Sequence, residues 1–143
     1  MRNLLNIFKA LSDETRVRML KLLEGGELCI CKIMDVLDMK QSRVSRHMGI
    51  LKNARLVKDR RDGKWVHYSL NPKPEDFSHK EIISLLEKCL KDYAVVARDR
   101  EELRKLLEKE KKGLWRPGST CGAMKEGSRG KGQRGRVNAE LRQ

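Results

Sequence analysis

Two short helical patterns joined by a tight connection constrain this chain most. The first has apolar residues at the i, i+3, i+4, i+7 spacing of a helix with one buried stripe: Ile30, Ile33, Met34 and Leu37. After Asp38-Met39-Lys40, a second helix is predicted over 41–53, with an apolar side of Val44, Met48 and Leu51. Two short helices connected this closely are typical of a helix-turn-helix.

The second helix carries polar groups on the side away from its apolar stripe. At 100° per residue, Ser42, Arg46, Gly49 and Asn53 fall opposite Val44, and Arg43 and Ser45 lie beside them. Hydroxyl, amide and guanidinium groups suit base edges and phosphates, although many polar faces are simply solvated. The tight turn and the positive charge favour DNA recognition by Gln41, Ser42, Arg43, Ser45, Arg46 and Asn53.

A β-hairpin is predicted directly after these helices. Residues 57–61 and 64–70 flank Asp62-Gly63, a strong two-residue turn signal, and Val66, Tyr68 and Leu70 alternate as an inner face. A basic hairpin in this position is a wing whose cations approach phosphate or the minor groove; the alternative is a solubilising charged turn. The wing residues that we expect at DNA are Arg60, Arg61 and Lys64.

The distribution of charge agrees with a polyanionic partner. The net charge is +13, and residues 40–64 hold nine Lys/Arg against two Asp/Glu. No signal peptide or apolar run of membrane length is visible, so we expect a cytoplasmic protein with no membrane partner. No arrangement for hydrolysis, phosphoryl transfer or thiol–disulfide exchange is visible either, so we expect no enzyme and no organic cofactor.

Helices are predicted on both sides of this centre. Residues 3–11 form an apolar helix, and Ser12 is the expected N-cap of the helix that ends at Gly25-Gly26. After Asn71-Pro72-Lys73-Pro74, one long helix is predicted over 77–112. Its heptad-like seam indicates packing between two subunits, through Ile82, Leu86, Cys89, Tyr93, Val96, Arg100, Leu103 and Leu107. A two-fold dimer would present two recognition helices to successive major grooves.

We therefore predict a mainly α fold with a β-hairpin wing, a dimeric winged helix-turn-helix. Its DNA-binding domain covers 1–75, with the first helix also in the dimer interface, and its dimerisation helix covers 76–112. Residues 113–143 hold seven of the eleven glycines and seven Lys/Arg, so we expect a disordered basic tail. Such a tail either adds sequence-independent DNA affinity or is merely solvated.

The cysteines give the chain its most specific chemistry. Cys29 and Cys31 stand two residues apart just before the predicted recognition helix, while Cys89 and Cys121 lie far along the chain. This pattern does not fit a secreted disulfide framework, so the thiols are expected to be free. The pair is either a site for a soft ion or two small buried apolar residues.

Residues 11–72 resemble the ArsR family of bacterial metal-sensing winged-helix repressors. The resemblance is carried by Leu11-Ser12-Asp13-Glu14-Thr15-Arg16, Glu27-Leu28-Cys29-Ile30-Cys31, Gln41-Ser42-Arg43-Val44-Ser45-Arg46-His47-Met48 and Gly63-Lys64-Trp65-Val66-His67-Tyr68. It implies a homodimeric repressor that leaves operator DNA when an inducer ion binds. Glu-Leu-Cys-x-Cys resembles the arsenite- and antimonite-responsive branch, and also occurs in a cadmium- and lead-sensing branch.

The resemblance implies As(III) or Sb(III) as inducer at Cys29 and Cys31. We expect both cysteines at the start of the third helix, where side chains two residues apart point about 200° apart, so ligation must unwind the first turn. As(III) prefers three thiolates, and the family's third cysteine is replaced here by Met34. Cys89 or Cys121 is a possible third ligand, as are water, hydroxide or a small thiol, although Cys89 fits a packed seam better.

Other readings remain open for the same fold. Zinc- and nickel-type sites of the family pair His with acidic residues in the last helix, where His79 stands alone. His47 and His67 fit structural roles better. The alternatives are a regulator that responds to thiol oxidation or to another soft or borderline metal (Cd, Pb or Zn), and a non-sensing architectural DNA-binding protein.

Overall fold

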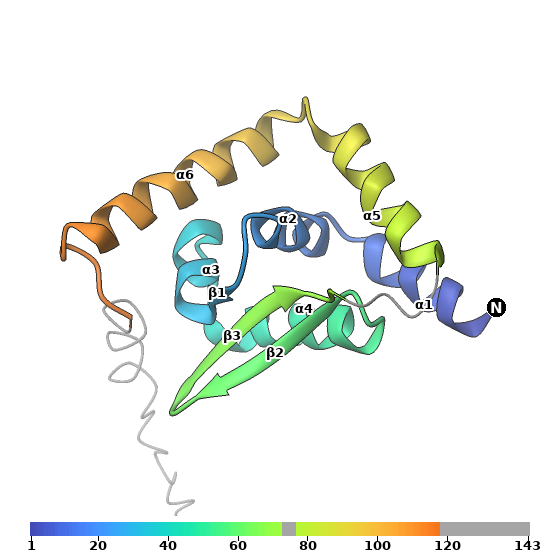
Figure 1. Ribbon diagram of the computed structural model, residues 1–143, viewed down its shortest axis with the longest axis horizontal. Coiled ribbons are helices and arrows are strands. Elements are labelled where there is room, and N and C mark those ends of the chain that lie inside the picture. The colour runs from blue at the N-terminus through green and yellow to red at the C-terminus, as the bar shows by residue number, and fades with distance from the viewer. Residues whose placement is uncertain (73–76, 118–143) are drawn as a thin grey trace, which may run out of the picture.

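The computed structural model describes residues 1–72 and 77–117, and all structural statements concern these residues (Figure 1). They form six helices and one three-stranded antiparallel sheet of order β1-β3-β2. The elements are α1 (Arg2–Leu11), α2 (Glu14–Leu23), β1 (Leu28–Cys29), α3 (Ile30–Leu37), α4 (Gln41–Asn53), β2 (Val57–Asp62), β3 (Trp65–Leu70), α5 (Phe77–Leu90) and α6 (Ala94–Lys111). The predicted class, mainly α with a winged helix-turn-helix, is confirmed.

The boundary between α1 and α2 differs from the prediction by one residue. Ser12 closes α1, and its hydroxyl donates to the Lys9 carbonyl at 2.7 Å. Asp13 is the N-cap of α2 and accepts a hydrogen bond from the Arg16 amide at 3.0 Å. A carboxylate satisfies an amide at a helix N-terminus and interacts favourably with the helix dipole there, which gives Asp13 the advantage over Ser12.

The helix-turn-helix has the predicted bounds. Asp38 adopts a left-handed conformation with φ of 51° and ends α3, and the Met39 amide donates back to the Met34 carbonyl at 3.0 Å. Helix α4 then begins at Gln41 and buries Val44, Met48 and Leu51 completely. Its apolar back is therefore part of the central core, and its other side remains available to solvent.

The wing is the hairpin β2–β3, and its turn lies one residue later than predicted. Asp62 pairs with Trp65, so Gly63 and Lys64 form the two-residue loop. Gly63 has φ of 59°, as the first central residue of a type II′ turn requires. Strand β1 was not predicted; its Cys29 pairs with His67 on the other side of β3.

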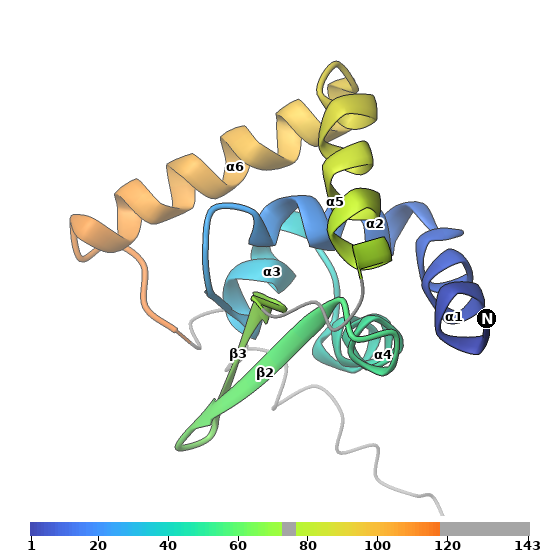
Figure 2. The ribbon, with the colours of Figure 1, turned by 45° about the vertical axis from the view of Figure 1, so that its right-hand side comes forward.

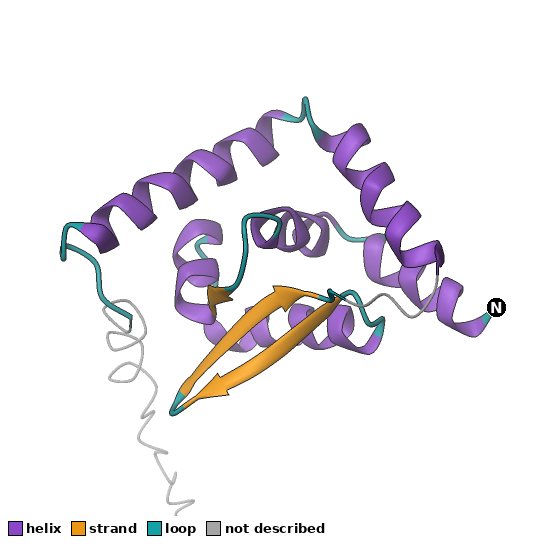
Figure 3. Cartoon of the chain, in the orientation of Figure 1, coloured by secondary structure: helices purple, strands orange, loops and turns teal. Residues whose placement is uncertain are grey.

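The single helix predicted over 77–112 is wrong, because the chain forms α5 and α6 with a break at residues 91–93 (Figure 3). Tyr93 has extended backbone angles and is the N-cap of α6. Helix α6 turns back over α2 and α3 of its own chain (Figures 1 and 2) and buries Val96, Leu103 and Leu106. Val96 and Leu103 belong to the predicted seam between subunits, but here they pack within one chain. The contacts within the chain therefore decide how these positions are used, and the heptad periodicity does not.

Candidate nucleic-acid interface and thiol pair

The predicted DNA-reading residues of α4 share one property: each is exposed to solvent. They are Gln41, Ser42, Arg43, Ser45, Arg46 and Asn53. Two of them carry guanidinium groups, and all are held on a helix whose opposite side is completely buried. This is a rigid polar surface of the kind that base edges and phosphates require.

Two contacts fix the orientation of α4. His47 is half-buried, and its Nδ1 lies 3.8 Å from Oδ1 of Asp13, the N-cap of α2. Burial lowers the pKa of His47, and the charges of Arg16, Arg43 and Arg46 lower it further. The carboxylate of Asp13 acts in the opposite direction and raises this pKa. On another side, the Ser45 side chain hydrogen bonds with Tyr68 of β3, whose pKa is raised chiefly by burial. Ser45 thus links the recognition helix to the wing.

The wing cations are exposed but not equivalent. Arg61 and Lys64 lie near the hairpin tip, and Lys64 Nζ lies 5.2 Å from the centre of the Trp65 ring. Arg60 instead forms two charge-assisted hydrogen bonds with Glu27, at 2.6 and 3.2 Å. This pair joins the wing to the segment just before the thiols, and a DNA phosphate would compete with Glu27 for Arg60.

The two thiols of the predicted inducer site are buried. Cys29 is 4% exposed and Cys31 is 1% exposed, and both belong to the central core cluster. The expectation that both lie in a regular helix is wrong: Cys29 has φ of −64° and ψ of 145°, and it is the N-cap of α3. Its extended conformation follows from strand pairing with His67, which a helical residue cannot make.

Cys29 and Cys31 therefore belong to two different elements. Cys29 lies in the strand that extends the wing sheet, and Cys31 lies in the first turn of the helix that precedes α4. The predicted unwinding of a helical turn shared by both cysteines therefore does not apply, because Cys29 is not part of the helix. Instead, an ion bound by both thiols would act on β1 and α3 at the same time.

Of the remaining predicted ligands, the structure describes Cys89, and it does not place Cys89 in a metal-ligand group with this pair. Cys89 is on α5 and is exposed in the single chain, so the chain's own core does not bury it. Cys121 lies outside the described residues. Within the described part of the chain, no group of three or more His, Cys, Asp or Glu is placed to hold a metal ion. Met34 is buried in the core, as its place in the apolar stripe predicted.

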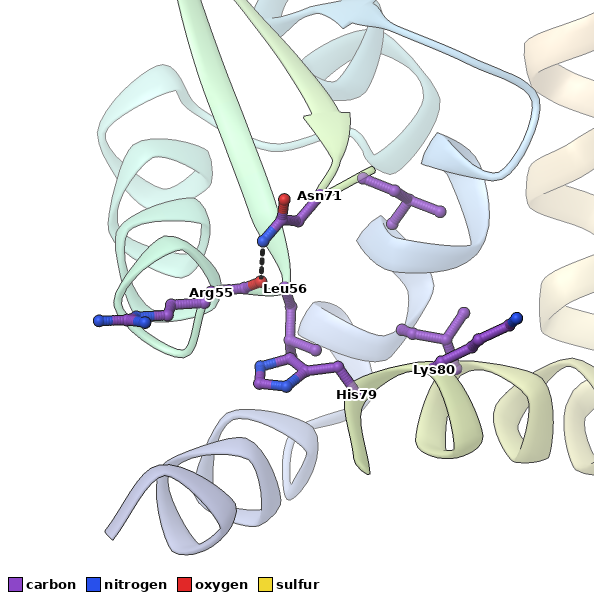
Figure 4. Close-up of a pocket in the computed structure, with 7 residues that line it drawn as sticks. Arg55, Leu56, Asn71, His79 and Lys80 are labelled. Carbon is purple, nitrogen blue, oxygen red and sulfur yellow. Dashed lines mark hydrogen bonds between the residues drawn. The ribbon is translucent and has the colours of Figure 1, made fainter. Parts of the chain in front are cut away.

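His79 has a structural environment instead of a ligand set. It lies in the wall of a hollow of about 160 Å³ between α5 and the start of the wing (Figure 4). Its Nε2–H donates to the Ala54 carbonyl at 3.1 Å, and the ring is almost fully buried. Asn71, in the same hollow, donates to the Arg55 carbonyl at 3.0 Å. The His79 contact fastens α5 to the end of α4, and the Asn71 contact fastens the end of the wing to the same segment.

Across residues 1–72 and 77–117, no helix combines the length and the apolar content that crossing a bilayer requires.

The fold and the polar face of α4 define a winged helix-turn-helix domain of the DNA-binding class. A solved structure with the same fold is the homodimeric winged helix-turn-helix DNA-binding domain Mb0332 from Mycobacterium bovis. The TM-score is 0.54 at 22% identity, over 65% of this chain and 82% of that one. At this identity the likeness concerns the fold alone.

Sequence comparison defines the family. Residues 13–59 match the arsR family of bacterial regulatory proteins. The HTH-type transcriptional regulator MJ1325 of Methanocaldococcus jannaschii is 46% identical over 82 residues, which cover 57% of this chain and 88% of that regulator. The chain belongs to the arsR family.

A relative with a named function matches a shorter stretch. The arsenical resistance operon repressor of Escherichia coli K12 is 48% identical over 69 residues, which are 48% of this chain. The match spans 59% of that repressor's length.

Proposed function

We propose that this protein is an arsenite- and antimonite-responsive transcriptional repressor that binds operator DNA as a homodimer. As(III) or Sb(III) binding to Cys29 and Cys31 releases it from the operator. The observation that carries the proposal is the position of the thiol pair, which spans the junction between β1 of the wing sheet and α3 of the helix-turn-helix. The similarity to the E. coli arsenical repressor supports the choice of inducer.

The donor chemistry fits a soft ion in part. Thiolates are the softest ligands that a protein offers, and As(III) favours three of them in a pyramid. Cys29 and Cys31 supply two at the N-terminal end of α3. For the third we propose Cys121 or Cys89, because Met34 offers only a neutral thioether.

The reach of Cys121 is limited by chain length. It follows Trp115 by six residues, a span of at most about 20 Å when fully extended. Trp115 contacts α3 itself, since its indole donates to Asp35 at 2.6 Å. In the ion-free chain this anchor keeps the start of the C-terminal segment beside the helix that carries Cys31, where an ion first enters.

Burial of the thiols makes ion binding a conformational event. With Cys29 and Cys31 at most 4% exposed, an ion reaches both sulfur atoms only after β1 or the first turn of α3 moves. An ion that binds only the open form shifts the population toward that form. Opening disturbs the DNA-reading elements directly, because β1 pairs with β3 and α3 leads into α4.

The dimer is proposed to form through the exposed apolar side chains of α1 and α5. These include Leu4, Leu5 and Phe8 on α1 and Leu85 on α5, with exposures between 37% and 58%. Residues 1–75 then act as the DNA-binding domain, and α5 supplies the dimerisation helix. Two-fold symmetry places two α4 helices on successive major grooves.

Fluorescence anisotropy on a labelled operator duplex tests the proposal. Arsenite, antimonite, cadmium and peroxide are titrated separately into complexes of the wild type and of Cys29→Ser. We expect arsenite and antimonite to release the wild type and to leave Cys29→Ser bound. Release by peroxide alone would instead indicate a thiol oxidation sensor, and unchanged binding with every agent would indicate a DNA-binding protein without this sensing function.

The third ligand is tested in the same assay with Cys89→Ala and Cys121→Ser. The variant that lacks the third thiolate is expected to need at least about tenfold more arsenite for release, which corresponds to about 1.4 kcal/mol. Analytical ultracentrifugation checks that each variant remains dimeric. If both respond as the wild type does, a non-protein ligand completes the ion.

A further inference from the structure

Helix α3 is held on two sides by different parts of the chain. On one side lies the core, which covers Cys31 and Met34. On the other side α6 runs past α3 (Figures 1 and 2), and Trp115, after the end of α6, contacts Asp35 of α3. Helix α6 lies beyond residues 13–59, where the family match ends. The contacts between α6 and α3 therefore join a helix within the matched region to one that the match does not cover.

Helix α6 is anchored at both ends. Near its start, Arg18 of α2 donates two hydrogen bonds to the almost fully buried carboxylate of Asp99, at 2.6 and 2.8 Å. At its other end, Lys32 Nζ of α3 lies 2.8 Å from Glu110 Oε2. Bidentate guanidinium–carboxylate pairs are among the strongest polar contacts in proteins, so the Arg18 end forms the fixed end of α6.

Trp115, just after the end of α6, makes further contacts with α3, the helix that carries Cys31. Its Nε1–H donates to Asp35 Oδ2 at 2.6 Å, and Lys32 Nζ lies 5.6 Å from the centre of its ring. Asp35 follows Cys31 by four residues, and positions i and i+4 lie on the same face of a helix, one turn apart. Trp115 therefore holds the first two turns of α3, where an ion bound to Cys31 would act.

The Trp115–Asp35 contact uses only one oxygen of its carboxylate, whereas in the Arg18–Asp99 pair both oxygens accept hydrogen bonds. The second carboxylate oxygen of Asp35 is buried and has no hydrogen-bond partner within the described residues. Beside it lies a hollow of about 200 Å³ lined by residues of α3 and α6 and by Trp115. Since close-packed interiors resist displacement, this hollow leaves α3 space to move on the Trp115 side.

We propose that Trp115 is a positioning residue for the thiol pair. By holding Asp35 and Lys32 it keeps α3 in its ion-free position, and ion binding at Cys29 and Cys31 breaks the Trp115 contact. Part of the binding free energy of the ion is spent on this release, so Trp115 raises the inducer concentration that the repressor needs. The proposal rests on the arsenite response proposed above.

The test uses the full chain and the operator anisotropy assay. Trp115→Phe removes the indole donor and keeps an aromatic ring, and Leu114→Ala changes the exposed neighbouring side chain as a matched control. We expect Trp115→Phe to lower the arsenite concentration for half-release about three- to tenfold, with ion-free operator affinity unchanged. Asp35→Asn keeps an acceptor for the indole, so its half-release concentration should stay nearer to the wild-type value.

A spectroscopic readout separates positioning from a structural role. In a Trp65→Phe chain, Trp115 is the only tryptophan. Its emission should shift to the red as arsenite binds, and the midpoint of this shift should match the arsenite concentration for half-release. The proposal is overturned if arsenite releases the wild type but Trp115→Phe has the same half-release concentration, whether or not its stability falls. Constant Trp115 emission through the titration also overturns it. If arsenite fails to release the wild type, the proposed function fails first and this inference with it.

Discussion

The polar face of α4 and the thiol pair before α3 are built in opposite ways. The proposed DNA-reading residues stand exposed on a helix whose back is fully buried. Cys29 and Cys31 are instead covered by the core in which they lie. Under the proposed function, DNA binding therefore uses the structure as it stands, whereas ion binding requires the structure to open.

The largest expected effect is a difference in the free energy of unfolding between substitutions on the buried side and on the exposed side of α4. Met48→Ala removes a completely buried side chain and should lower the free energy of unfolding by about 2–5 kcal/mol. Ile50→Ala, on the same helix at 37% exposure, should cost less than about 1 kcal/mol. Urea denaturation monitored by circular dichroism measures both, and equal losses would contradict the buried-back assignment.

The closed state of the thiol pair is the next prediction. If opening costs about 3 kcal/mol, alkylation of Cys29 and Cys31 is about 100-fold slower in the folded protein than in urea. Mass spectrometry after timed iodoacetamide pulses gives the rate at each cysteine. Equal rates in the folded and unfolded chains would show that the pair is open, and would remove the contrast with α4.

The exposed side of α4 should affect DNA and not stability. Arg46→Ala is expected to weaken specific operator binding by about 1–3 kcal/mol, with unfolding unchanged. Lys91→Ala removes the same charge between α5 and α6 and serves as the control. Anisotropy titrations at one fixed salt concentration compare the two, and similar losses would mean that only net charge matters.

The smallest effect concerns pH. Because burial lowers the pKa of His47, the unfolded chain binds this proton more readily than the folded chain does. The contribution of His47 to the free energy of unfolding is constant above pH 6.5, the ordinary pKa of histidine. Below pH 6.5 the free energy of unfolding falls by at most about 1.4 kcal/mol per pH unit. His47→Gln should flatten that decline in urea melts between pH 7 and 5; an unchanged slope would contradict it.

Local patterns predicted the DNA-binding half of the molecule well. The stripe of α3, the tight connection at 38–40 and the bounds of α4 follow from side chains that lie within a few residues of one another. The hairpin was predicted for the same reason, with an error of one residue at Gly63.

The features that were missed depend on partners far along the chain. Strand β1 has two residues and exists because β3, about forty residues later, pairs with it. The break before α6 accompanies the contact between Arg18 and Asp99, and the Trp115–Asp35 contact joins residues 80 apart. Burial of the cysteines was equally hidden, because free Cys suits both a core and an ion site.

Hydrogen–deuterium exchange with and without arsenite tests most directly the claim that the thiol pair is closed and opens on ion binding. In the wild type, arsenite should speed amide exchange at residues 28–31 and at the paired residues 67–68, and leave the buried side of α4 at 44–51 protected. Cys29→Ser should show no such change. Unaltered exchange at 28–31 in a protein that arsenite has released from its operator would contradict the account.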